Sequence, residues 1–143
     1  MSPGPSFRHV HRVTYAECTV GNHIYHSRYL DLLEAARGEF LRSLGQPVLG
    51  LQEAGFIFPV IEAHLRYKRP ARYDDLLHIG LSLTVLQGVR LGVLHRVERA
   101  DGVLLLEAET LHVCTGLDDR PRRMPAGFVE ALRPWLRQAP AGV

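Results

Sequence analysis

An amphipathic helix that follows a polar turn dominates the N-terminal part of the sequence. Its apolar residues recur at spacings of three and four, as in a helix that packs along one broad face. These residues are Tyr29, Leu33, Ala36, Phe40 and Leu44, with Leu30, Leu32 and Leu41 widening the stripe. Ser27 or His26 stands at the N-cap position, and Asp31 puts a negative charge near the positive end of the helix. Gly45 and then Pro47 end it.

Alternating apolar and polar residues follow the helix for roughly sixty positions, enough for several strands of ordinary length. We expect strands at 7–15, 56–69, 76–86, 89–99 and 103–114, a short helical segment within 46–55 and a C-terminal helix at 126–137. The 103–114 strand is the most apolar, so we expect it at the centre of the sheet. The 56–69 strand should bury one of its faces, which carries Ile61, Ala63, Leu65 and Tyr67.

One helix followed by antiparallel strands predicts an α+β fold. A helix of this length spans roughly 25 Å, about the width of five strands. We therefore expect the hotdog fold, with a five-stranded antiparallel sheet wrapped around one long central helix and a short C-terminal helix. The 143 residues suffice for a single domain, which we place at 1–143 with 1–6 as a flexible lead-in.

Composition excludes several classes of function. Hydrophobic residues make up 46% of the chain and charged residues 22%, and a net charge of +2 gives no reason to expect nucleic acid as a partner. Cys18 and Cys114 lack the spacing of metal ligands and indicate a reducing compartment. Because residues 1–6 are polar and proline-rich, we expect no signal peptide there, and no apolar run reaches membrane length. We expect a cytoplasmic protein without a membrane span.

Several motifs stand in the order typical of one thioesterase family. They are Glu17-Cys18-Thr19, Asn22-His23-Ile24-Tyr25-His26, Tyr29-Leu30, Glu34-Ala35-Ala36-Arg37 and Tyr67-Lys68-Arg69-Pro70. Over roughly residues 8–137 the chain resembles the 4-hydroxybenzoyl-CoA thioesterase-like branch of hotdog proteins, which includes the Tol–Pal-associated acyl-CoA thioesterases. The resemblance implies hydrolysis of acyl-CoA or acyl carrier protein thioesters, without a metal or organic cofactor.

The resemblance also implies roles for residues at the turn. The family's backbone donor to the thioester carbonyl falls on His26, where a helix N-terminus favours an oxyanion. Its catalytic acid falls on Thr19, and a hydroxyl cannot replace a carboxylate as a base. Thioesterases of enediyne biosynthesis, which the turn also resembles, work without that acid. The alternative is therefore a weak or inactive acyl-thioester-binding protein.

Each candidate for catalysis has a structural alternative. Thr19 can orient water or simply hydrogen-bond the turn, as threonine often does. If the backbone is extended, the Glu17 side chain points to the same side of the strand as that of Thr19 and can reach the site. The alternative is that Glu17 is a surface carboxylate near Arg12 or Arg28. The imidazole of His26 is a suitable base or a cap. His23 either orders the turn or takes part in catalysis.

The remaining aromatic, charged and histidine side chains divide into binding and structural candidates. Tyr25 and Tyr29 are interpreted as core residues or as the wall of an acyl pocket, with acid catalysis as the alternative. Asn22, Arg69 and Arg90 are candidates for substrate binding. For the two arginines the reason is that a guanidinium group can bind the phosphates of coenzyme A through two parallel hydrogen bonds. Glu34 and Arg37, one helical turn apart, predict an ion pair. Three further histidines are interpreted as interface or hydrogen-bonded core residues: His64, His95 and His112.

An exposed edge strand predicts self-association. We expect a homodimer at least, and a homotetramer as the larger assembly, with the 56–69 strand in contact and active sites between subunits.

Overall fold

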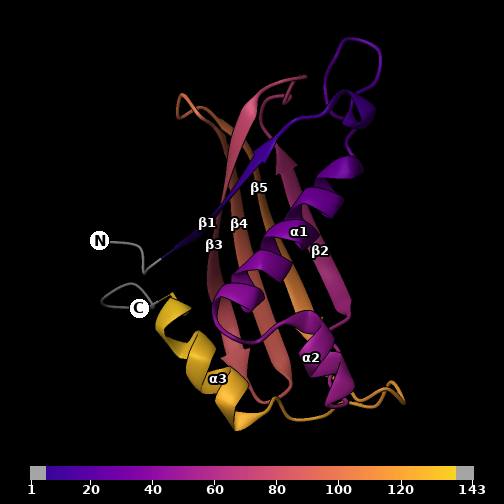
Figure 1. Ribbon diagram of the computed structural model, residues 1–143, viewed down its shortest axis with the longest axis vertical. Coiled ribbons are helices and arrows are strands. Elements are labelled where there is room, and N and C mark those ends of the chain that lie inside the picture. Colours follow the sequence, from indigo (N-terminus) through magenta and orange to yellow (C-terminus); the bar gives the residue numbers. More distant parts are fainter. Residues whose placement is uncertain (1–5, 138–143) are drawn as a thin grey trace.

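The computed structural model describes residues 6–137, in which five antiparallel strands form one sheet in the order β1-β3-β4-β5-β2 (Figure 1). The strands are β1 Phe7–Arg12, β2 Val60–Tyr67, β3 Leu76–Gln87, β4 Arg90–Arg99 and β5 Leu104–Val113. The expected five-stranded antiparallel sheet is confirmed. The expectation that the 103–114 strand is central is wrong, because β4 takes the middle position and β5 lies between β4 and the edge strand β2.

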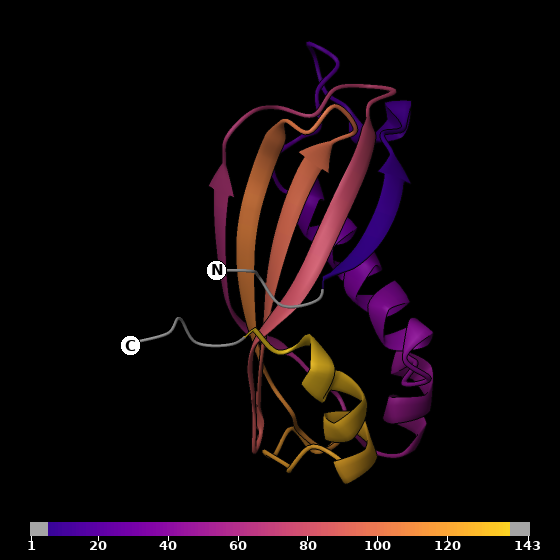
Figure 2. The same cartoon turned by 90° about the vertical axis from the view of Figure 1, so that its left-hand side faces the viewer.

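Helix α1 (Arg28–Ser43, 16 residues) crosses one face of the sheet and contacts β1 and β3 (Figures 1 and 2). It buries the residues of the predicted stripe that point to the sheet: Tyr29, Leu32, Leu33, Ala36, Phe40 and Leu41. Gly45 follows with a φ of +72°, a left-handed conformation that only glycine adopts without strain. The sequence therefore located both ends of this helix.

Two shorter helices lie at the end of the sheet opposite to the start of α1 (Figure 1). Helix α2 (Val48–Glu53) falls within the segment where helical turns were expected. Helix α3 (Ala126–Leu132) is shorter than the predicted 126–137, and a 3₁₀ turn over Arg133–Trp135 replaces its last part. Proline lacks an N–H donor and clashes with the preceding helical turn, so Pro134 accounts for this end.

Strand β2 differs most from its prediction. Its expected inner face is exposed at Ile61, Ala63 and Tyr67 and half-buried at Leu65. The reason is topological. β2 is an edge strand, and α1 packs over β1 and β3, which lie at the opposite end of the strand order. On β3, by contrast, the predicted inward residues from Leu77 to Leu83 are almost fully buried. Within residues 6–137, no helix is long and apolar enough to cross a membrane.

Candidate active site

A cavity of about 560 Å³ lies beside the start of α1. Its wall brings together six of the predicted site residues: Thr19, His23, Tyr25, His26, Tyr29 and Arg69. Ile24, Tyr67, Lys68 and Pro70 complete it. The turn before α1 therefore meets the end of β2 and the loop that follows it, which are distant in sequence. A second hollow of about 500 Å³ along β2 and β5 contains none of the predicted site residues.

A tight backbone turn positions Thr19. Its N–H donates to the carbonyl of His23 at 3.0 Å, and its hydroxyl donates to the same oxygen at 3.4 Å. Asn22 adopts a φ of +61° in this turn, and its carbonyl accepts the N–H of Tyr73 at 2.7 Å. Asn22 does not line the cavity. The structural alternative for Thr19, a hydroxyl bonded to the turn, is thus realised, and the hydroxyl oxygen keeps acceptor capacity.

The start of α1 presents unpaired backbone donors. Ser27 is the N-cap residue, but its side chain makes no capping hydrogen bond. Among residues 6–137, no acceptor takes the N–H of His26 or of Ser27. The first N–H groups of a helix carry partial positive charge and favour an anion. The turn can therefore stabilise an oxygen that gains negative charge.

Aromatic side chains pack around the His26 imidazole. The His26 imidazole lies 4.4 Å from the Tyr25 ring and 6.4 Å from the Tyr67 ring, measured between centroids. The Tyr29 hydroxyl accepts the N–H of Ala71 at 3.0 Å, and burial raises its pKa. The Tyr29 hydroxyl therefore already accepts a hydrogen bond from the backbone and keeps its proton, which fits a wall residue better than an acid catalyst.

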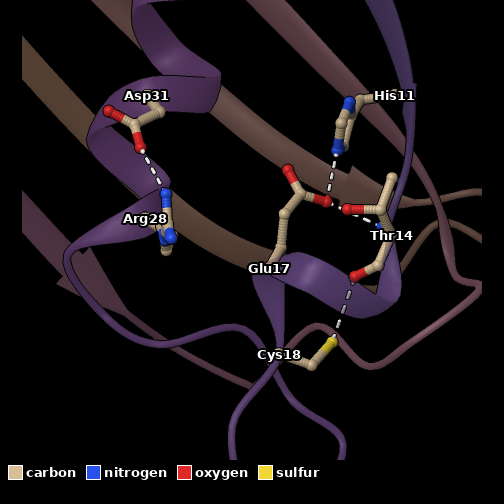
Figure 3. A network of polar contacts seen from close by, with 6 residues as sticks. All are labelled: His11, Thr14, Glu17, Cys18, Arg28 and Asp31. Carbon is tan, nitrogen blue, oxygen red and sulfur yellow. Dashed lines mark hydrogen bonds and ion pairs between the residues drawn. The ribbon is translucent and has the colours of Figure 1, made fainter.

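Glu17 does not reach the cavity. Residues Tyr15–Glu17 form a 3₁₀ turn instead of continuing the first strand, so the expected extended backbone is wrong here. The Glu17 carboxylate accepts the N–H of Thr14 at 2.7 Å and lies 2.9 Å from Nε2 of His11 (Figure 3). Partial burial raises its pKa, but hydrogen bonds from Thr14 and His11 outweigh that effect and lower it overall. Glu17 is therefore a weaker base than a free glutamate.

The expected partners of Glu17 are engaged elsewhere. Arg28 pairs with Asp31 in the first turn of α1, with 3.6 Å between nitrogen and oxygen (Figure 3). Arg12 donates to the carbonyl of Asp74 at 2.8 Å. The alternative of a Glu17 pair with either arginine is wrong, because His11 takes that place.

Arg90 lies far from this cavity in the same chain. It pairs with Val113 at one end of the sheet, whereas Tyr67 pairs with Leu106 toward the other end. Within one protomer, Arg69 lines the cavity and Arg90 does not.

Three of the other predicted polar residues, Arg37, His95 and His112, lie in or against the core. Instead of pairing with Glu34, the Arg37 guanidinium contacts His95 at 3.3 Å. His95 and His112 are buried and hydrogen-bonded, as the core interpretation required, and His64 is exposed on β2. Across residues 6–137, no three His, Cys, Asp or Glu side chains gather in a way that could hold a metal ion.

One site residue was missed from the sequence. The Tyr67 hydroxyl donates to the carbonyl of His26 at 2.9 Å, yet Tyr67 was expected to be an inward-facing strand residue. Its position in the Tyr67-Lys68-Arg69-Pro70 motif was the available signal, since that motif ends a strand beside the turn.

Comparisons with known proteins agree with this geometry. Residues 13–136 match the model of the thioesterase-like superfamily. The acyl-CoA thioester hydrolase YbgC of Escherichia coli is 36% identical over 126 residues, 86% of this chain and 92% of the relative. A protein of Thermus thermophilus described as hypothetical superimposes with a TM-score of 0.85 at 34% identity, over 92% of this chain and 98% of that one.

The dynemicin thioesterase superimposes with a TM-score of 0.86 over 94% of this chain and 100% of its own. At 23% identity it supports the fold alone. The family match and the YbgC relative carry the assignment: this chain belongs to the thioesterase-like superfamily and has its hotdog fold.

Proposed function

We propose that this protein hydrolyses acyl thioesters of coenzyme A or acyl carrier protein. The observation that carries the proposal is that the N–H groups of His26 and Ser27 have no acceptor among residues 6–137, while His26 itself lines a cavity that also holds the Thr19 hydroxyl. Thioester hydrolysis needs donors for the carbonyl oxygen and a group that activates water. The activity named for the YbgC relative agrees with this reading.

The turn at His26 and Ser27 supplies the donors. As water adds to the thioester carbon, the carbonyl oxygen becomes an oxyanion that accepts from their N–H groups. One well-aimed donor contributes roughly 3 kcal/mol to the transition state. The tetrahedral intermediate then expels the thiolate, which takes up a proton, so that the products are a carboxylic acid and a free thiol.

His26 is the side chain we propose as the base. It lines the cavity, and a neutral imidazole has a ring nitrogen that can accept a proton from water. It takes a proton from the attacking water and returns it to the leaving thiolate. Glu17, the other candidate, bonds His11 and Thr14 away from the cavity. We propose that the Thr19 hydroxyl orients the water, with one of its lone pairs as acceptor.

Two cationic side chains on the cavity wall suit the phosphates of a coenzyme A or phosphopantetheine substrate. Lys68 and Arg69 are both exposed there. Arg90, at the other end of the sheet, can contribute only to a cavity of another subunit. We expect no metal or organic cofactor in this chemistry, and we expect the reaction to occur in the cytoplasm.

We further propose that the active unit is a homodimer or homotetramer joined through β2. This edge strand exposes Val60, Ile61 and Tyr67, an apolar strip beside unpaired backbone groups. Pairing with the β2 strand of a second copy would cover the apolar side chains and the unpaired backbone groups. Because Tyr67 lines the cavity, the contact would place the site next to the subunit boundary.

A panel of acyl-CoA substrates tests the function, with the released thiol as the readout. We expect turnover for at least one chain length or aromatic acyl group, and loss of turnover in His26→Ala. The second candidate is an acyl-thioester-binding protein without catalysis, and one observation favours it: among residues 6–137, no carboxylate lines the cavity. Binding of the whole panel by calorimetry without any thiol release would decide for that candidate.

A further inference from the structure

Tyr67 connects the edge strand to the turn that carries the proposed oxyanion donors. It is the last residue of β2, and its hydroxyl donates to the carbonyl oxygen of His26 at 2.9 Å. The ring lies edge-on to Tyr29, with centroids 5.5 Å apart. The hydroxyl is therefore placed by two independent features, strand pairing and ring packing.

The hydrogen bonds around His26 fix two successive peptide planes. The Tyr25 carbonyl accepts the N–H of Arg28 at 2.9 Å, and the His26 carbonyl accepts the Tyr67 hydroxyl at the same distance. In a planar trans peptide the N–H points opposite to the C=O. Fixing these carbonyls therefore also fixes the directions of the N–H groups of His26 and Ser27, which have no acceptor among residues 6–137.

We propose that Tyr67 is a positioning residue, whose hydroxyl holds the His26–Ser27 peptide in the orientation that presents the Ser27 N–H as the second oxyanion donor. This inference rests on the proposed function. The Arg28 N–H fixes only the first of the two peptides, and no other described group bonds the His26 carbonyl. Without the Tyr67 hydroxyl, the second peptide can rotate, and the Ser27 N–H loses its orientation beside the fixed His26 N–H before the substrate arrives.

The structure separates this role from that of a simple tether. Tyr67 is attached through its backbone pairing with Leu106 and through ring packing, and neither contact needs the hydroxyl. Tyr67→Phe removes one oxygen atom and leaves both. Tyr73→Phe is the matched control, since Tyr73 is half-exposed and packs its ring on Tyr15.

Steady-state kinetics on the best substrate give the first readout. Donors that act on the developing oxyanion affect kcat more than KM, so Tyr67→Phe should lower kcat about tenfold with KM nearly unchanged. Para-aminophenylalanine at position 67 keeps a donor and should restore much of the rate. If Tyr67→Phe and Tyr73→Phe had the same kcat as the wild type, the positioning role would be refuted.

An infrared measurement tests the inference without turnover. The probe is an acyl-CoA analogue with CH₂ in place of the thioester sulfur and a ¹³C-labelled ketone carbonyl. Hydrogen bonds to the carbonyl lower its stretching frequency. We expect a lowered frequency in the wild type and in Tyr73→Phe, and a partial return toward the free value in Tyr67→Phe.

The two readouts distinguish the failure of each proposal. Loss of the lowered frequency in Tyr67→Phe, in a protein that hydrolyses nothing, would support the positioning role and refute the hydrolase. An unchanged frequency in Tyr67→Phe, or no lowering in the wild type, would overturn the positioning role. The thermal midpoint of each variant shows whether it is folded. If Tyr67→Phe proved unfolded, two other variants at position 67 would replace the comparison of Tyr67→Phe with the wild type: para-aminophenylalanine, which has a donor, and para-methoxyphenylalanine, which lacks one.

Discussion

The Arg37 guanidinium on α1 lies 3.3 Å from Nε2 of His95 on β4 and joins the helix to the sheet. The other ring nitrogen of His95, Nδ1, is 3.2 Å from the carbonyl of Ala108. A carbonyl only accepts, so Nδ1 carries the proton and Nε2 accepts from Arg37. The ring is therefore neutral, with both nitrogens satisfied inside the core.

This arrangement makes stability depend on pH. Burial, and next the charge of Arg37, lower the pKa of His95 from 6.5 to about 3. The unfolded chain therefore binds more protons than the folded one between these values, and the contribution of His95 to stability, complete above pH 6.5, is lost as the pH falls toward 3. Burial also lowers the pKa of His112, which adds to the same slope.

We expect His95→Asn to weaken this dependence. Its amide N–H can replace the Nδ1 donor, but it does not titrate, so the free energy of unfolding should fall less steeply from pH 7 to pH 4. At pH 7 the variant should lose about 1–3 kcal/mol, because the Arg37 contact is disturbed. Urea unfolding at several pH values measures both effects. His78→Asn, on the half-buried part of β3, is the control; an unchanged slope in His95→Asn would contradict the neutral, buried assignment.

Glu17 provides a prediction about catalysis. Because its carboxylate bonds Thr14 and His11 outside the cavity, Glu17→Gln should leave kcat within about twofold of the wild type, as for a residue that does not touch the substrate. His26→Ala should lower kcat far more, by about 100-fold or more if the imidazole is the base. The comparison uses thiol release at saturating substrate. A large loss in Glu17→Gln with a small one in His26→Ala would reverse the assignment of the base.

Local patterns predicted the secondary structure well because their causes are local. The 3.6-residue period located α1, and the glycine at position 45, which has a φ of +72°, located its end. The 3₁₀ turn at Tyr15–Glu17 was missed, although Thr14 and Glu17 have the spacing of a capping box. The alternation of residues 7–15 favours an extended strand, whereas the hydrogen bond from the Thr14 N–H to the Glu17 carboxylate caps the turn.

Tertiary placement could not be predicted from the same patterns. The apolar alternation in the β2 sequence is the same whether the covering surface comes from this chain or from another, so the burial of Ile61 and Tyr67 could not be assigned. Arg37 has Glu34 one turn away, but burial against β4 directs its guanidinium to His95 instead. The Tyr67–His26 contact joins residues 41 positions apart, and only the folded structure reveals it.

Thr19 offers a test by gain of activity. The resemblance places the family's carboxylate at this position, on the wall of the cavity near His26. Thr19→Asp should therefore raise kcat by adding a stronger base beside intact backbone donors. Thr19→Asn, of similar size but without charge, should not. Thr19→Val should cost only about 1 kcal/mol of transition-state stabilisation, as expected for a hydroxyl that orients water. If Thr19→Val abolished turnover while His26→Ala did not, Thr19 would have to act as the nucleophile.

The exposed edge at β2 predicts how the chain assembles. Ile61 on β2 is 54% exposed and Val10 on the opposite edge strand, β1, is 49% exposed, so lysine at either position changes the surface to a similar degree. Lysine on an edge strand opposes pairing with another strand. If the subunits join through β2, Ile61→Lys should shift the protein toward monomer in light scattering at micromolar concentration, whereas Val10→Lys should keep the wild-type mass. Turnover per chain should fall with the loss of the dimer in Ile61→Lys, because the cavity lies next to the proposed subunit boundary. A wild-type protein that was already monomeric would refute the assembly, and equal masses for the two variants would place the contact elsewhere.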